Sequence, residues 1–166
     1  SKTFVDWMKD DPRLPILAAR RSDKSTAIAD LIGMPNGSTG ATVADTSIYA
    51  EPNRGVITGR DAPMVFQTYA EVRLLKAEMA FRGWSVPGDA KTHYEAGVKA
   101  AMQMLGTIYP KTTAISDAQV ATYLAAKPYD AAKGWEMISE QYWAATLLNE
   151  YESFNNWRRT LFYNFT

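Results

Sequence analysis

The chain has 166 residues, enough for one ordinary domain with a hydrophobic core. It carries 18 Lys and Arg against 18 Asp and Glu, which argues against a broad nucleic-acid-binding surface. No cysteine and a single histidine exclude disulfides, thiolate chemistry and any multi-histidine metal site. No run of about 18 apolar residues is present, so no membrane-spanning helix is expected. The start, SKTFVDWMK, lacks the layout of a signal peptide.

The first third of the chain has few long periodic segments. Thr3–Lys9 is expected to form a short helix and Ile16–Ala19 a short strand. Residues 33–62 are rich in Gly, Pro, Asn, Ser and Thr, which predicts a long irregular excursion. Such an excursion is either a functional surface or plain irregular surface. Within it, Ser47–Ala50 and Gly55–Thr58 are expected to pair as a small hairpin.

Pro63–Gly83 reads as a central helix. It is apolar around most of its circumference, so it is expected to pack against several neighbours inside a helical assembly. Pro63 suits the first helical turn and Gly83 suits the end. One narrow stripe is polar: Gln67, Glu71, Glu78 and Arg82.

A second amphipathic helix follows after a short connection and is expected to close at Gly106. Its apolar face recurs at helical spacing. With the central helix it forms an expected helical hairpin over residues 63–106. Small residues at the expected contact and a tyrosine make this hairpin similar to half of a tetratricopeptide repeat. The predicted buried face is Tyr94, Val98, Ala101, Met102 and Leu105.

Two further helices are expected. Ser116 and Gln119 fit a capping box at the start of a helix that ends at Lys127, before a proline. Asp130 is the expected cap of the next helix, and Gln141 is expected to lie off its buried face. The predicted buried face is Trp135, Ile138, Tyr142, Ala145 and either Leu148 or Asn149.

No pattern for catalysis stands out. On one helix face Glu71 and Glu78 would lie roughly 10–11 Å apart, too far for the carboxyl pairs of glycosidases, which need about 5–9.5 Å. His93 is expected near the exposed side of its helix. Asp10–Asp11, followed by Pro12–Arg13, form either a cation site or, as the favoured reading, a turn that an ion pair of Arg13 locks. We therefore expect no catalytic residues, no metal site and no enzyme, but a binding or structural protein.

Six stretches carry a family resemblance. They occur in the order DDPRLP (Asp10–Pro15), TYAEVRLLKAEMAFRGW (Thr68–Trp84), DAKTHYEAGVKAAM (Asp89–Met102), YLA (Tyr123–Ala125), ISEQYWA (Ile138–Ala144) and NWRRT (Asn156–Thr160). Together they resemble the C-terminal half of SusD/RagB-family outer-membrane lipoproteins. In that family the last motif continues with Gly-Tyr-Pro, whereas here Leu161–Thr166 follows.

The resemblance implies a mostly α fold with tetratricopeptide-like hairpins and long irregular loops. Residues 1–166 would form a single C-terminal region, a fragment of a longer protein, with exposed apolar surface where the other half packs. The family captures glycans or other nutrients at the cell surface and delivers them to a SusC-type TonB-dependent transporter. It needs no organic cofactor, and its membrane association is through a lipid anchor in the missing N-terminal part.

The ligand contacts of such a protein are expected on loops. Aromatic faces stack on sugar rings, while Asn and Arg side chains hydrogen-bond hydroxyl groups. The candidates in this chain are Tyr49, Asn53, Arg54 and Trp84. The alternative function is a tetratricopeptide-like scaffold that binds a protein partner, and a helical glycan-processing enzyme is a more distant one. The framework residues expected to be structural are Arg13, Glu71, Glu78, Tyr94, Gln141, Trp143, Arg158 and Arg159.

Overall fold

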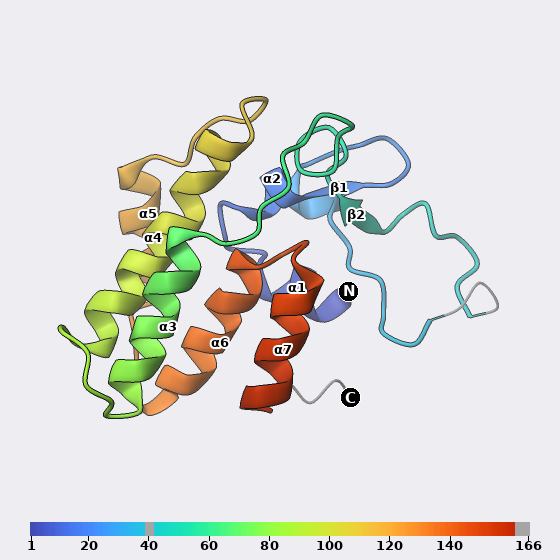
Figure 1. The fold of residues 1–166 in the computed structure, drawn as a ribbon. Helices are drawn as coiled ribbons and strands as arrows, with labels where there is room; N and C mark the ends of the chain where they lie inside the picture. Colours follow the sequence, from blue (N-terminus) through green and yellow to red (C-terminus); the bar gives the residue numbers. More distant parts are fainter. Residues whose placement is uncertain (39–41, 162–166) are drawn as a thin grey trace. The chain divides into compact units, whose positions relative to one another are not determined.

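The computed structural model describes residues 1–38 and 42–161. The chain divides into two compact units, one of Ser1–Pro63 with Leu105–Ile115 and the other of Met64–Met104 with Ser116–Thr166. In the described part, seven α-helices and two short strands make the fold mostly α, as expected (Figure 1). None of these helices combines the length and apolarity that crossing a bilayer requires.

The first unit contains short elements joined by long connections. Strand β1 pairs antiparallel with β2, with Ala18 opposite Pro52. The expected hairpin between Ser47–Ala50 and Gly55–Thr58 is therefore wrong, because β2 takes its partner from much earlier in the chain. The expected strand at Ile16–Ala19 is also displaced, since Leu14–Leu17 is helical. The elements are α1 (Lys2–Trp7), α2 (Leu14–Leu17), β1 (Ala18–Arg20), a 3-10 turn (Ile28–Asp30) and β2 (Ala50–Pro52).

A buried ion pair locks the turn before α2. The Arg13 guanidinium donates from Nε to Asp11 Oδ1 (2.9 Å) and from Nη2 to Asp11 Oδ2 (2.6 Å). The Arg13 backbone N–H donates to the same Oδ1 at 2.9 Å. Both side chains are 1% exposed. The favoured reading of this motif, an arginine pair rather than a cation site, is confirmed.

Gly33 begins the expected excursion at residues 33–62. A Cβ placed on Gly33 would lie 2.4 Å from Lys2 Cα, and the Lys2 N–H donates to Met34 O at 2.7 Å. Only a residue without a side chain fits this approach of two backbones. Of the excursion, β2 is regular, and residues 39–41 lie outside the described residues. The excursion as a domain boundary stays a prediction.

The second unit is a layer of helices. Figure 1 shows the helices side by side in the order α4, α3, α6 and α7, with α5 beside α4. Their antiparallel course follows from the short loops that join successive helices. The helices are α3 (Tyr69–Phe81), α4 (Ala90–Ile108), α5 (Asp117–Ala126), α6 (Gly134–Ala145) and α7 (Glu150–Thr160), with a 3-10 turn at Ala131–Lys133. The end of α4, from Leu105 on, belongs to the first unit.

Helix α3 begins later than its apolar pattern predicted. The Thr68 hydroxyl accepts from the Glu71 N–H, and the Glu71 carboxylate accepts from the Thr68 N–H, which makes a capping box. Because this box satisfies the first free N–H groups, the helix starts at Tyr69, and the expected start at Pro63 is wrong. The expected stop at Gly83 is confirmed, since Gly83 has a positive φ of 73° directly after the C-cap.

Helix α4 packs closely on α3. A Cβ on Gly97 would lie 2.7 Å from Leu74 Cγ, so the glycine permits the approach. The helix does not close at Gly106 as expected, but continues to Ile108, with Gly106 against Ala114. All residues of the predicted face are buried: Tyr94, Val98, Ala101, Met102 and Leu105.

The ends of α5 follow the sequence prediction. Ser116 and Gln119 form the reciprocal capping box, and the C-cap is Lys127. In α6, Asp130 caps the 3-10 turn that precedes the helix rather than α6 itself. Gln141 was expected off the buried face, but it is buried because its amide donates to the Tyr123 hydroxyl at 2.9 Å.

Candidate functional site

Three of the four candidate residues flank β2 in the first unit: Tyr49 precedes the strand, and Asn53 and Arg54 follow it. Tyr49 is half-buried, and its carbonyl accepts from the Arg21 N–H at 3.0 Å. Asn53 is buried and its side-chain Oδ1 accepts from the Gly55 N–H at 3.1 Å, which is an Asx turn. The Asn53 N–H donates to Leu17 O at 2.9 Å. The Asn53 amide is thus engaged in shaping the turn.

Arg54 is exposed and belongs to a cluster of cations around one carboxylate. The Glu51 carboxylate accepts from Arg54 (3.2 Å), Arg21 (3.3 Å) and Lys24 (2.8 Å). Hydrogen bonding from Lys24, followed by Arg21 and the charge of Arg54, lowers the pKa of Glu51 despite its burial. Three cations therefore surround one carboxylate, and Arg54 is the most exposed of them.

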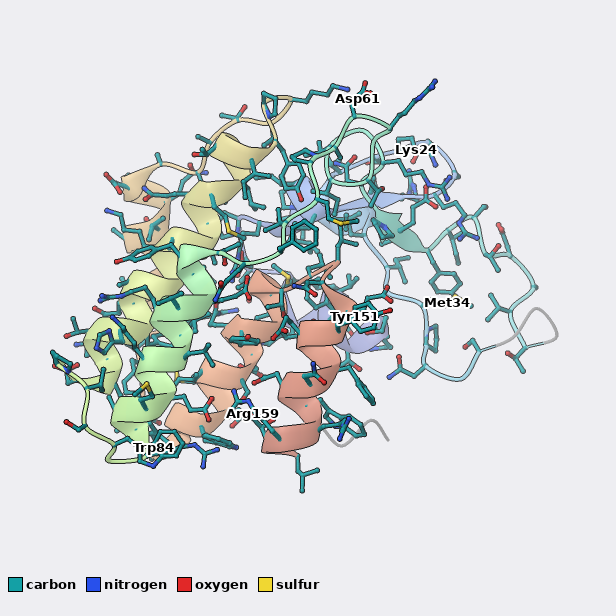
Figure 2. All side chains as sticks on the ribbon, viewed as in Figure 1. Lys24, Met34, Asp61, Trp84, Tyr151 and Arg159 are labelled. Atoms are coloured by element: carbon teal, nitrogen blue, oxygen red, sulfur yellow. The ribbon has the colours of Figure 1, made fainter. Side chains whose placement is uncertain are left out.

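The fourth candidate, Trp84, belongs to the second unit and follows α3. The Trp84 N–H donates to Met79 O (2.9 Å), and the Gly83 N–H donates to Ala80 O (3.1 Å). These two bonds, with Gly83 left-handed, are a Schellman motif that fixes the backbone of Trp84. Trp84 remains 57% exposed, just beyond the C-terminal end of α3 (Figure 2).

An arginine lies between two tryptophans beside this position. The Arg82 guanidinium carbon is 5.5 Å from the Trp84 ring centroid and 4.3 Å from that of Trp135. Trp135 in turn stacks on Phe81, with centroids 6.0 Å apart. We call these four side chains the aromatic stack: Phe81, Trp135, Arg82 and Trp84.

The buried Glu78 carboxylate connects the aromatic stack to α7. Its Oε1 accepts from Arg82 Nε at 2.8 Å and also from Arg159 Nη1, and its Oε2 accepts from Arg159 Nη2 at 2.6 Å. Burial raises the pKa of Glu78, but the hydrogen bonds and charges of the two arginines outweigh it and leave that pKa below its ordinary value. The spacing of four residues between Glu78 and Arg82 is typical of an ion pair on one helix face, but no local pattern indicates that Arg159 or Trp135 would join it.

The carboxylates of α3 are held in structural contacts. Burial raises the pKa of Glu71, and Thr68 opposes this shift by hydrogen bonding. Glu71 closes the capping box and Glu78 pairs with two arginines, so each carboxylate has a fixed structural partner. In residues 1–38 and 42–161, no group of three or more acidic or histidine side chains could hold a metal ion.

His93 was expected near the exposed side of α4, and this is wrong. The side chain is buried, with Nε2 donating to Pro87 O at 2.7 Å. Gly88, whose φ is 93°, lies directly against the imidazole, so the loop before α4 folds over it.

Helix α7 presents an exposed apolar face. Tyr151, Phe154 and Leu161 are exposed at helical spacing, and the Arg158 guanidinium lies over the Phe154 ring at 5.8 Å. This is the kind of surface expected where a further part of a longer protein would pack. What covers it stays a prediction, and residues 162–166, part of the divergent ending, lie outside the described residues.

Comparison with protein-family models gives one match over residues 1–166. The matching family is SusD-like, described as starch-binding and associating with the outer membrane. The chain belongs to the SusD-like family. The family resemblance carried by the six sequence stretches is therefore confirmed.

Solved SusD-like structures share the fold. A chitin-binding protein matches with 29% identity and a TM-score of 0.83, over 98% of this chain and 37% of that chain. A Bacteroidetes AC2a SusD-like protein matches with 24% identity and a TM-score of 0.74, over 97% of this chain and 42% of that chain. A SusD homolog from Bacteroides fragilis NCTC 9343 matches with 22% identity and a TM-score of 0.76, over 98% of this chain and 39% of that chain.

The chain thus spans about two fifths of the length of these SusD-like structures. A search of the curated proteins found no match.

Proposed function

We propose that this SusD-like protein binds glycans at the surface of the outer membrane. The observation that carries the proposal is the family match over residues 1–166, whose family is described as starch-binding and associating with the outer membrane. The 29% identity to a chitin-binding protein supports it. Within this function, the protein is a surface-exposed lipoprotein, anchored by lipid, that delivers bound glycans or other nutrients to a SusC-type TonB-dependent transporter. It is a binding protein and not an enzyme.

The candidate contacts divide between two surfaces. On the first unit, Tyr49 and Arg54 offer an aromatic ring and a guanidinium on either side of β2. Asn53 contributes through the turn that orients Arg54, because its amide is already hydrogen-bonded to Gly55. On the second unit, the exposed Trp84 indole offers a face for a sugar ring.

Calorimetric titration of the protein with chitohexaose, maltohexaose and cellohexaose tests the proposal. We expect saturable binding to at least one, with a Kd between about 1 µM and 1 mM. Folded protein, verified by circular dichroism, that binds none of the three would overturn glycan binding. If no glycan binds, the exposed apolar face of α7 favours the second candidate function, a scaffold that binds a protein partner.

A further inference from the structure

We propose that the aromatic stack is the preorganised sugar-binding platform of this protein, with Trp84 against the apolar face of one pyranose ring. Glu78 and Arg159 act as positioning residues that hold Arg82 under the indole. This inference rests on the proposed glycan-binding function and assigns its contact to one surface of the second unit.

The backbone of Trp84 is fixed before any ligand arrives. The Schellman bonds of Gly83 and Trp84 tie the chain to the last turn of α3. The Schellman motif requires a residue with left-handed backbone between Arg82 and Trp84, and Gly83 has a φ of 73°. A Cβ on Gly83 would meet no atom within 4 Å, so the backbone conformation and not a steric limit favours glycine here. The indole therefore projects from a defined point at the helix end.

The ring itself is held by a cation with its own support. Arg82 lies 4.3 Å from the Trp135 centroid and 5.5 Å from that of Trp84, so the guanidinium occupies the space between the two indoles. Trp135 is kept in place by Phe81. Gly134 makes this packing possible, because a Cβ there would lie 2.8 Å from Phe81 Cδ2.

Charge pairing aligns the guanidinium. Glu78 is buried and accepts from Arg82 Nε, while Arg159 of α7 occupies its other oxygen at 2.6 Å. A carboxylate shared by two arginines cannot turn away from Arg82 without leaving a buried charge unpaired. Residues of two helices, α3 and α7, therefore hold the platform in place before ligand binds. Binding then loses little conformational entropy in these side chains.

This arrangement fits the chemistry of a pyranose ring. Trp84 keeps more than half of its surface exposed although Arg82 lies beside it, so an apolar ring face is available for stacking. Among the described residues, Nε is the Arg82 nitrogen with a hydrogen bond. Its terminal nitrogens are therefore donors for a ring hydroxyl or an acetamido carbonyl next to the stacked face.

Other exposed aromatic residues lack this support. Tyr69 is 65% exposed, and the Arg73 guanidinium carbon lies 5.9 Å from its ring centroid. Tyr69 lies in the first turn of α3, at the opposite end of the helix from Trp84. No second aromatic ring lies on the other side of Arg73 in the described part of the chain. Tyr69 is for this reason the matched control: an exposed ring beside an arginine, without the stack.

The test is calorimetric titration of wild type and five variants with the hexasaccharide that binds tightest. We expect Trp84→Ala to weaken binding about tenfold or more, and Trp84→Phe to keep it within about threefold. Arg82→Lys should weaken binding like Arg82→Ala, because an ammonium lacks the planar surface that fills the space between indoles. Tyr69→Ala should leave the Kd unchanged. A ligand-induced change in tryptophan fluorescence should disappear in Trp84→Ala.

Glu78→Gln separates positioning from simple stability. It retains the shape of Glu78 but removes its charge, and we expect weaker binding at a temperature well below the measured melting transition of the variant. Wild-type binding that survives Trp84→Ala and Arg82→Lys unchanged overturns the platform and leaves glycan binding intact. Wild type that binds no hexasaccharide overturns the proposed function instead.

Discussion

Breaking the buried Asp11–Arg13 pair should destabilise the protein strongly. Asp11→Ala removes two charge-assisted hydrogen bonds, Nε–Oδ1 at 2.9 Å and Nη2–Oδ2 at 2.6 Å, together with the backbone bond to Oδ1. At about 1.5–3 kcal/mol for each bond to a charged group, the two side-chain bonds amount to about 3–6 kcal/mol. Removal of one partner from a buried pair costs about 3–5 kcal/mol. We expect a loss of about 4 kcal/mol, a large share of a typical total of about 5–15 kcal/mol.

Urea unfolding followed by far-UV circular dichroism and tryptophan fluorescence measures this loss. The control is Glu95→Ala, which removes the exposed pair of Lys91 and Glu95, with side chains 62% and 38% exposed; it should cost at most about 0.5 kcal/mol. In the double variant Asp11→Ala with Arg13→Met, the loss should fall well below the sum of the two single losses, since no charge remains buried alone. A loss under about 1 kcal/mol for Asp11→Ala, or additive single losses, would refute the locking role.

Three further substitutions test local features, each by its urea midpoint. Ser116→Ala removes the hydroxyl of the α5 capping box and should cost about 1 kcal/mol, whereas Ser116→Asp should restore it. Gly33→Ala places a Cβ 2.4 Å from the Lys2 backbone and should cost about 1–3 kcal/mol, while Gly37→Ala, with no neighbour within 4 Å but a φ of 71°, tests the cost of φ alone. Burial raises the folded pKa of Glu71, so the stability it contributes is present below its ordinary pKa and is lost as pH rises through the folded pKa. Glu71→Gln keeps the acceptor of the capping box and should make the free energy of unfolding depend less on pH. An unchanged pH dependence would show that Glu71 does not cause the loss of stability.

Local features of the second unit followed from short stretches of sequence. The capping box at Ser116 and the stop at Gly83 depend on residues within a few positions, so they can be identified without a fold. The buried face of α4 follows from the helical period, which holds for any partner that covers it. The capping box at Thr68 depends on the same kind of short-range signal, but Pro63 offers an earlier start that fits the apolar pattern as well.

Burial of polar groups depended on partners elsewhere in the chain. Gln141 is interior because Tyr123 hydrogen-bonds it, and His93 is interior because the loop before α4 folds over it. The sequence around Gln141 or His93 has no periodic pattern that indicates these partners. A local pattern alone therefore predicts an exposed position for these polar residues.

The family, the helical class and the ends of several helices were determined by the order of motifs and by short-range chemistry in the sequence. The assembly of the candidate platform was decided by tertiary structure. Glu78 joins Arg82, four residues away, to Arg159, 81 residues away, and Trp135 reaches the same guanidinium from α6. Hydrogen bonds and ring contacts act over a few ångströms regardless of sequence separation, so residues this far apart along the chain become one site when helices α3, α6 and α7 pack together.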